Sequence, residues 1–106
     1  MHIPREIYMV LHTTTGRMYI GSSKNAHHRF KQHLELLKYG KHHVEDMQND
    51  YDGPGNYSLS ILDKVTLYEE RNKEYEWMKK YNSHIRGIGY NYKDIATVQL
   101  GKKKAV

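Results

Sequence analysis

Two pairs of residues in the first third of the chain have types and spacings suited to chemistry on an anionic substrate. Tyr8 and Tyr19 lie in neighbouring strand-like segments, so their rings come close if both face one side. Arg29 and His33 are four residues apart on a predicted helix and share a face. A guanidinium can bind phosphate through two hydrogen bonds, and an imidazole can hydrogen-bond a phosphate oxygen or assist a tyrosine. Each residue alone is more often structural, so only the combination indicates a site.

Glu74 is a fifth candidate because it falls among the core-facing positions of a predicted helix near the C-terminal end. The inward stripe of that helix comprises Leu67, Arg71 or Glu70, Glu74, Trp77 or Met78, and Tyr81. Burial of an unpaired carboxylate is costly, whereas one carboxylate with waters and a substrate phosphate is an acceptable ligand set for Mg²⁺. The two interpretations are a metal ligand and an ordinary helix glutamate.

Turn and capping signals divide the chain into six elements that would position these residues. The predicted strands are residues 5–11, 17–21 and 57–65, and the predicted helices are 26–39, about 43–51, and from a capping box at Thr66 and Glu69 to about 81. The order β-β-α-α-β-α with short connections predicts an α+β domain. We expect a small three-stranded antiparallel sheet flanked by about three helices.

The first predicted helix has one apolar face. Its members recur at i, i+4, i+8 and i+11 and are Ala26, Phe30, Leu34 and Leu37. Arg29 and His33 lie about 100° round from Phe30 and Leu34. We therefore expect Arg29 and His33 to flank the core, where a cleft can form.

Composition favours a polyanionic partner and excludes several other classes. The chain has 17 Lys and Arg against 12 Asp and Glu, a net charge of +5, which suits nucleic acid or an anionic membrane surface. It contains no cysteine, so neither a disulfide nor a cysteine-ligated zinc site is available. Histidine pairs at 27–28 and 42–43 do not indicate zinc, because adjacent helix residues point about 100° apart and no HxxxH partner is present. No apolar run approaches the roughly 20 residues that span a bilayer, and the N-terminus lacks an apolar signal segment, so we expect a cytoplasmic protein.

In order along the chain, these residues resemble the GIY-YIG nuclease family. The two halves of its motif correspond to Glu6-Ile7-Tyr8 and Tyr19-Ile20-Gly21. Further matches are Arg29-x-x-x-His33, Glu74-x-x-Trp77 and Asn91 in a closing GYN, so the resemblance covers roughly residues 5–92. Glu6 replaces the first glycine of the motif, and a carboxylate there is expected to alter strand geometry or weaken phosphate binding. The spacing and flanks are most similar to catalytic domains of phage intron-encoded homing endonucleases.

The resemblance implies a metal-dependent DNA endonuclease that hydrolyses phosphodiester bonds. Glu74 would hold one Mg²⁺, for which Mn²⁺ substitutes, and Arg29 would balance charge in the transition state. A tyrosine beside the metal-bound water would relay its proton; we favour Tyr8 for this role, with Tyr19 orienting water or phosphate. His33 completes the expected catalytic set. Homing, restriction and repair-type nicking all remain compatible with the sequence, and a covalent phosphotyrosine route is disfavoured.

The same resemblance predicts how the domain meets double-stranded DNA. Residues 1–92 would form the nuclease domain and residues 93–106 a flexible basic tail. The expected DNA contacts are Lys24, Lys31, Asn91, Lys102, Lys103 and Lys104, with Lys24 placed where helix N–H groups favour anions. For Asn91 the alternative is a structural role, in which it ties down the closing segment. Binding through such contacts weakens steeply with salt. A homodimer or partner chain is expected where both strands are cut.

Two other functions are compatible with the same sequence. A non-catalytic nucleic-acid-binding module on this scaffold is the alternative, although intact Arg29, His33, Glu74 and both tyrosines favour an enzyme. A protein-interaction adaptor would leave the basic charge unexplained.

Overall fold

The predicted element order is confirmed, with one short 3₁₀ turn added. The computed structural model describes residues 4–93 of the 106-residue chain. The elements are β1 (Pro4–His12), β2 (Met18–Ser23), α1 (Ala26–Lys38), α2 (Glu45–Asp50), the 3₁₀ turn η1 (Pro54–Asn56), β3 (Tyr57–Thr66) and α3 (Glu70–Tyr81). No helix in residues 4–93 is long and apolar enough to cross a membrane.

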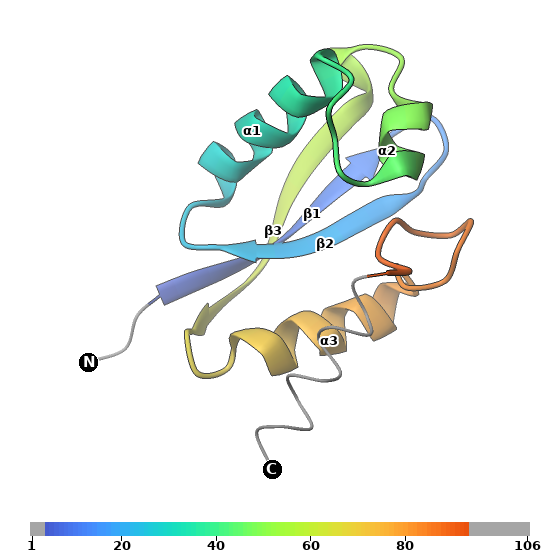
Figure 1. Cartoon of the computed structure of the whole chain (residues 1–106). Coiled ribbons are helices and arrows are strands. Elements are labelled where there is room, and N and C mark those ends of the chain that lie inside the picture. The colour runs from blue at the N-terminus through green and yellow to red at the C-terminus, as the bar shows by residue number, and fades with distance from the viewer. Residues whose placement is uncertain (1–3, 94–106) are drawn as a thin grey trace.

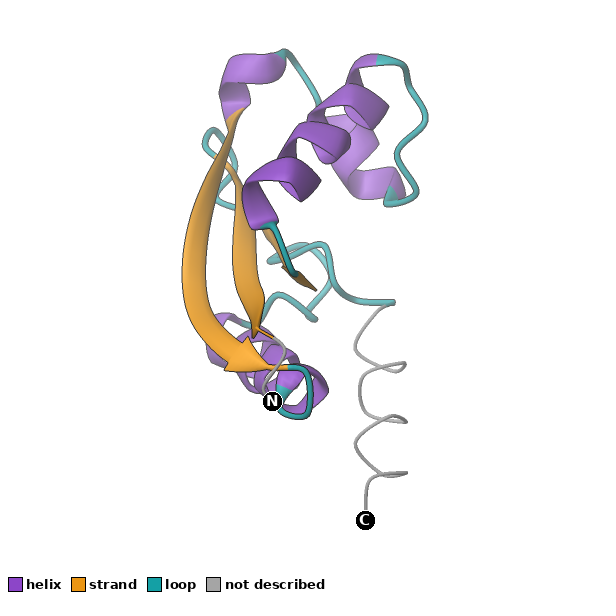
Figure 2. Cartoon of the chain, turned by 90° about the vertical axis from the view of Figure 1, so that its left-hand side faces the viewer, coloured by secondary structure: helices purple, strands orange, loops and turns teal. Residues whose placement is uncertain are grey.

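The three strands form one antiparallel sheet with β1 at its centre. The order is β2-β1-β3, and β1 pairs with both neighbours in antiparallel register, with an irregularity opposite β3 between Ile7 and Tyr8. Helices α1 and α2 cover one face of the sheet, and α3 covers the other (Figures 1 and 2). The α+β class and the antiparallel sheet are therefore as the sequence predicts.

Because side chains alternate along a strand, the sheet contributes to two separate cores. The core under α1 and α2 is formed by Tyr8, Val10, Ala26, Leu37, Val44, Met47, Tyr57 and Tyr90. The core under α3 is formed by Ile7, Met9, Ile20, Val65 and Met78. Tyr8 thus lies on the face that α1 covers, one residue away from apolar positions on the opposite face.

Asn25 caps α1, and the capping box predicted for the last helix is only partly correct. The Asn25 side chain accepts a hydrogen bond from His28 N at 3.1 Å, so it caps α1. The Glu69 carboxylate accepts from Thr66 N at 2.9 Å and Thr66 Oγ1 at 3.0 Å. However, residues 67–69 form a turn and α3 begins at Glu70. The prediction that Leu67 belongs to the inward stripe is wrong, since this side chain is 43% exposed in that turn.

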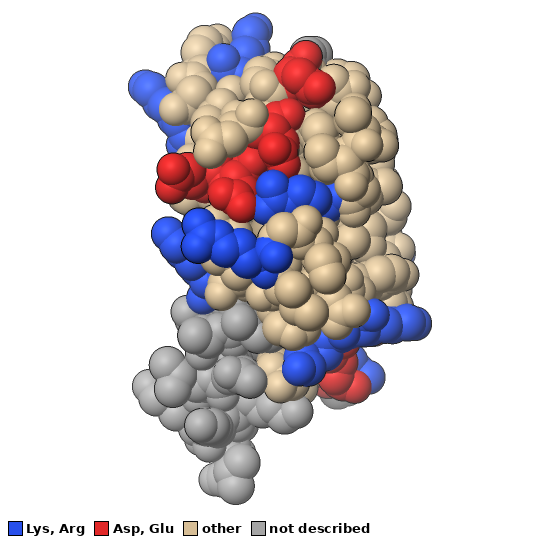
Figure 3. Space-filling view, turned by 90° about the vertical axis from the view of Figure 1, so that its right-hand side faces the viewer, with Lys and Arg blue, Asp and Glu red and all other residues tan. Residues whose placement is uncertain are grey.

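An ionic cluster ties the β1–β2 connection to α2 and the closing segment. Arg17 donates to Asp46 at 2.5 Å and to Asp50 at 2.9 Å, and its guanidinium lies 4.6 Å from the centre of the Tyr90 ring. The Tyr90 hydroxyl donates to Asp50 at 2.8 Å. Acidic side chains gather in the upper half of the face shown in Figure 3, and α2 contributes Glu45, Asp46 and Asp50.

The closing segment also binds the free edge of β2. Tyr90 N donates to Met18 O at 2.9 Å. The Asn91 side chain accepts from Ile20 N at 2.7 Å and donates to Ile20 O at 3.0 Å. The strand that carries Tyr19 is therefore fixed on both sides, by β1 and by residues 90–91.

Candidate active site

Tyr8 and Tyr19 come together on the α1 side of the sheet, as the sequence predicts. Their ring centroids are 6.4 Å apart. Gly21, the register partner of Tyr8, provides the space, because a Cβ there would lie 2.6 Å from the Tyr8 hydroxyl oxygen and 3.0 Å from the Tyr19 ring. The two tyrosines differ in accessibility: Tyr8 is 1% exposed, whereas Tyr19 is half-buried. Only the Tyr19 ring is appreciably open to solvent.

His33 joins this pair from α1 but is more deeply placed than expected. Its ring centroid lies 5.9 Å from that of Tyr8 and 5.2 Å from that of Tyr19. The prediction that His33 flanks the core is wrong: it is 0% exposed, while Phe30 and Leu34 are only partly buried. The physical reason is that polar partners for both ring nitrogens make burial of the imidazole acceptable.

Those partners form a hydrogen-bonded chain whose direction can be deduced from its backbone end. Val44 N–H donates to His42 Nδ1 at 3.0 Å, so the proton of neutral His42 is on Nε2. His42 Nε2–H then donates to His33 Nδ1 at 2.7 Å. Neutral His33 consequently carries its proton on Nε2 and donates to the Tyr8 hydroxyl oxygen at 2.9 Å. The Tyr8 oxygen is therefore held as an acceptor.

Both histidines are neutral near pH 7, which this direction requires. Burial, then the charges of Arg29 and the neighbouring histidines, lowers the pKa of His33 to about 3. Burial, the charge of His43 and the charge of Arg29 lower the pKa of His42 to about 4. The Tyr8 oxygen therefore accepts a hydrogen bond from a neutral imidazole.

Arg29 supplies positive charge at the solvent side of this cluster. It lies on α1 one turn before His33, and its side chain is half-buried. Its Nη1 donates to Gln32 Oε1 at 3.2 Å, a neutral acceptor that leaves the guanidinium charge uncompensated by that contact. The positive charge of Arg29 contributes to the lowered pKa of both His33 and His42. Arg29 and His33 lie one turn apart on α1, but His33 is buried in the core and Arg29 is not, so their joint role in a site stays a prediction.

Glu74 comes from the other side of the sheet. It is half-buried on α3, the helix whose contacts with the sheet are most extensive at β2, the strand of Tyr19. Within residues 4–93, no group of three or more His, Asp or Glu side chains is arranged to hold a metal ion. A metal bound at Glu74 would thus have one protein carboxylate and otherwise waters or substrate oxygens, a set that fits Mg²⁺ and not structural zinc.

Comparison with known proteins agrees with this geometry. The family described as GIY-YIG catalytic domain matches residues 6–91, most of the chain. The chain belongs to the GIY-YIG family. Intron-associated endonuclease 1 of Enterobacteria phage T4 is 33% identical over 91 residues. The match covers 83% of this chain and 36% of that relative, so the chain spans about a third of the relative's length.

Solved structures show the same GIY-YIG fold. A mutant form of the catalytic domain of intron endonuclease I-TevI superposes with a TM-score of 0.76 and 28% identity, over 86% of this chain and 95% of that one. The catalytic domain of homing endonuclease I-TevI gives a TM-score of 0.72 and 26% identity, over 81% of this chain and 95% of that one.

Two residues of this GIY-YIG domain have roles that differ from the sequence-based expectation. Of the two roles predicted for Asn91, the structure favours the structural one over a DNA contact, because Asn91 is 0% exposed and both ends of its amide are bonded to the backbone of Ile20. It positions the strand of Tyr19 instead. Glu6, at the motif's first glycine, accepts a hydrogen bond from Ala26 N at 2.8 Å. Its carboxylate favourably complements the positive end of α1.

The lysines predicted to contact DNA are not brought into the cluster. Lys24 and Lys31 are exposed. The amides at the start of α1 were expected to help Lys24 attract phosphate, but Ala26 N already bonds to Glu6 and His28 N to Asn25. Lys102, Lys103 and Lys104 lie outside the described residues, as does nearly all of the predicted 93–106 tail.

Sequence reasoning missed His42 and the role of Gly21. His42 follows His33 by nine residues across a helix end, a separation with no periodicity that would link them. It was considered only as half of a possible zinc pair. One sequence signal could have indicated that His42 is buried. It precedes the apolar residues Val44 and Met47, whose side chains are part of the core under α1 and α2.

Proposed function

We propose that this GIY-YIG domain is a metal-dependent endonuclease that hydrolyses phosphodiester bonds in double-stranded DNA. The observation that supports it most directly is the junction of Tyr8, Tyr19 and His33, with Arg29 at its solvent side. This places two groups that can handle protons beside a cation that can bind phosphate. The relative named as an intron-associated endonuclease supports a homing-type role.

The sequence-based expectation gives the proton relay to Tyr8, but the accessibility of the two tyrosines favours Tyr19 for that role. An attacking water must reach the group that receives its proton, and only Tyr19 is open to solvent. We therefore assign the water contact to Tyr19. Tyr8, fixed by His33, packs beside Tyr19 and orients it. As Tyr19 takes the proton of the water, it passes its own hydroxyl proton to solvent, so the pair carries no net charge after the step.

Arg29 and Glu74 have complementary roles in this proposal. The Arg29 guanidinium binds two oxygens of the scissile phosphate and stabilises the charge that grows on them. Glu74 holds Mg²⁺ by one carboxylate, with Mn²⁺ as a substitute. Bound there, the ion would withdraw charge from the phosphate and lower the pKa of a coordinated water. One such site cuts one strand, so cleavage of both strands requires a second copy, a partner chain or a second binding event.

A plasmid-nicking assay with Mg²⁺ or EDTA tests the proposal. Supercoiled DNA should be nicked only with the divalent ion. Glu74→Gln should reduce nicking by at least about 10³-fold, since it removes the only proposed protein ligand. Glu76→Gln, an exposed glutamate of the same helix, is the matched control and should nick at the wild-type rate. Retarded but uncut DNA with the wild-type chain would identify a binding module instead, and full activity of Glu74→Gln would remove the metal assignment.

A further inference from the structure

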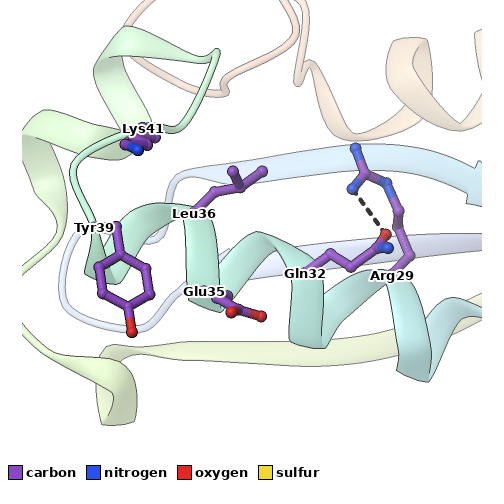
Figure 4. Close-up of a pocket in the computed structure, with 6 residues that line it drawn as sticks. All are labelled: Arg29, Gln32, Glu35, Leu36, Tyr39 and Lys41. Atoms are coloured by element: carbon purple, nitrogen blue, oxygen red, sulfur yellow. Dashed lines mark hydrogen bonds between the residues drawn. The ribbon is translucent and has the colours of Figure 1, made fainter.

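A groove lies along α1 and the loop that follows it. Its volume is about 390 Å³. It is lined by Arg29, Gln32, Glu35, Leu36, Tyr39 and Lys41. Figure 4 shows Arg29 towards the N-terminal end of the helix, Tyr39 at its C-terminal end and Lys41 on the loop that follows. Arg29 therefore belongs both to the groove and to the proposed active site.

The lining combines positive charge with an aromatic ring that is largely uncovered. Tyr39 is 62% exposed, although a ring of this size would bury favourably if it had a structural role. The Lys38 ammonium lies 5.6 Å from the centre of that ring, and Lys41 is exposed beside it. A basic groove with an exposed aromatic ring is the combination that binds single-stranded nucleic acid, where phosphates contact cations and a base stacks on the ring.

The length of the groove fits a few nucleotides. Arg29 and Tyr39 are ten residues apart, of which nearly all are helical, so they are separated by roughly 15 Å along the axis. At the roughly 3.4 Å per nucleotide of a stacked strand this corresponds to about four steps, and to fewer for an extended unpaired strand. A strand whose scissile phosphate is held at Arg29 would thus bring a base near Tyr39 about four nucleotides away.

We propose that this groove binds an unpaired segment of the substrate strand next to the cleavage site. In a fully paired duplex the base faces are stacked inside the helix, so they are inaccessible to Tyr39. An unpaired flank exposes them, and its backbone can follow the helix from Arg29 to Lys41. The inference rests on the proposed nuclease function and adds to it a preference for DNA with an unpaired flank. Examples of such DNA are a flap and a frayed end at a nick.

Glu35 is the one lining residue that opposes a polyanion. Its carboxylate is exposed, so water and salt screen it strongly. Two cations line the same groove, and a third stands beside the ring. An acidic peptide would meet the same cations but would gain nothing from a planar stacking surface, which is why DNA fits the lining better than a protein segment does.

Binding measured without cleavage tests this inference. The probes are a labelled DNA duplex and the same duplex with a four-nucleotide unpaired flank at either the 5′ or the 3′ end, with Kd measured by fluorescence anisotropy in EDTA. The wild-type chain should bind one flanked DNA about tenfold more tightly than the paired duplex, the gain expected from one stacked base. Tyr39→Ala should lose that preference, and Tyr39→Phe should retain it.

Tyr68→Ala is the matched control, since Tyr68 is 86% exposed in the turn before α3 and should not affect the preference. Equal affinity of the wild-type chain for all three DNAs, or a preference that persists in Tyr39→Ala, would overturn the inference. The result is separable from the nicking assay. A chain that nicks plasmid but shows no flank preference refutes the groove alone, and one that prefers the flank but never nicks refutes the nuclease function alone.

Discussion

The two faces of the sheet are built on different principles although the same strands supply both. The face under α3 is filled by aliphatic and methionine side chains: Ile7, Met9, Ile20, Val65 and Met78. The face under α1 buries polar groups as well, among them the Tyr8 hydroxyl and the rings of His33 and His42. Apolar packing tolerates small shifts, whereas a chain of hydrogen bonds fixes direction and distance. The polar face therefore fixes the orientation of the tyrosine–histidine cluster, whereas α3 on the apolar face carries Glu74.

Arg29→Ala should produce the largest functional effect on the polar face. Loss of a group that stabilises transition-state charge typically lowers the rate by about 10²–10³-fold. We expect that loss in the single-turnover rate of DNA cleavage, with affinity changed by only about threefold. Lys31→Ala, an exposed cation two residues along α1, should leave the rate unchanged. A change confined to Kd would show that Arg29 only binds the DNA backbone.

Met78→Ala, on the apolar face, should lower the stability of the fold and leave the cleavage rate nearly unchanged. Met78 is 1% exposed, and truncating a buried methionine costs about 2–5 kcal/mol through lost burial and a residual cavity. Urea unfolding should report that decrease in the free energy of unfolding. The cleavage rate, measured well below the melting temperature, should stay within about twofold of wild type. A large rate loss in a folded protein would mean that the two faces are coupled.

Substitution of the two tyrosines on the polar face should have different effects on the cleavage rate. Tyr19→Phe should lower the rate about tenfold or more and change the shape of its pH dependence, because it removes the group assigned to the water. Tyr8→Phe should lower the plateau of the rate without changing that shape. It should also reduce stability by about 1–3 kcal/mol, since the buried N–H of His33 loses its acceptor. If only Tyr8→Phe changed the shape of the pH–rate profile, the group that contacts the attacking water would be Tyr8 and not Tyr19.

The effect that is smallest near pH 7 is a pH dependence of stability to which the buried histidines of the polar face contribute. The pKa of His33 falls from 6.5 in the unfolded chain to about 3 in the folded one, so below pH 6.5 the unfolded chain binds a proton that the folded chain does not. Stability is then fully present above pH 6.5 and is lost as pH decreases towards 3, by about 1.4 kcal/mol per unit for this residue. Urea unfolding at several pH values measures it. His33→Phe should flatten the slope between pH 6 and 4, and an unchanged slope would assign it to other groups.

Local patterns in the sequence were sufficient for the elements and insufficient for the site's internal contacts. The strands, α1 and the antiparallel sheet follow from alternation, a helical apolar stripe and turn residues, all of which act within a few positions. His33 and Asn91 were identified as candidates, but their burial depends on partners 9 and 71 residues away, His42 and Ile20. No local signal encodes such pairings. The start of α3 was misplaced for a related reason, because the Thr66–Glu69 contact closes a turn as readily as it caps a helix.

The hydrogen bonds from Tyr90 and Asn91 to β2 have a consequence for how copies of the domain could assemble. In an antiparallel edge strand, alternate residues point their N–H and C=O groups outward, where another strand could add to the sheet. On β2 these groups include Met18 O, which Tyr90 occupies, and Ile20 N and O, which the Asn91 amide occupies. A side chain thus terminates the sheet where a backbone would otherwise extend it. Any second copy of the domain that joins by strand addition must do so at β3, which is the other edge of the sheet.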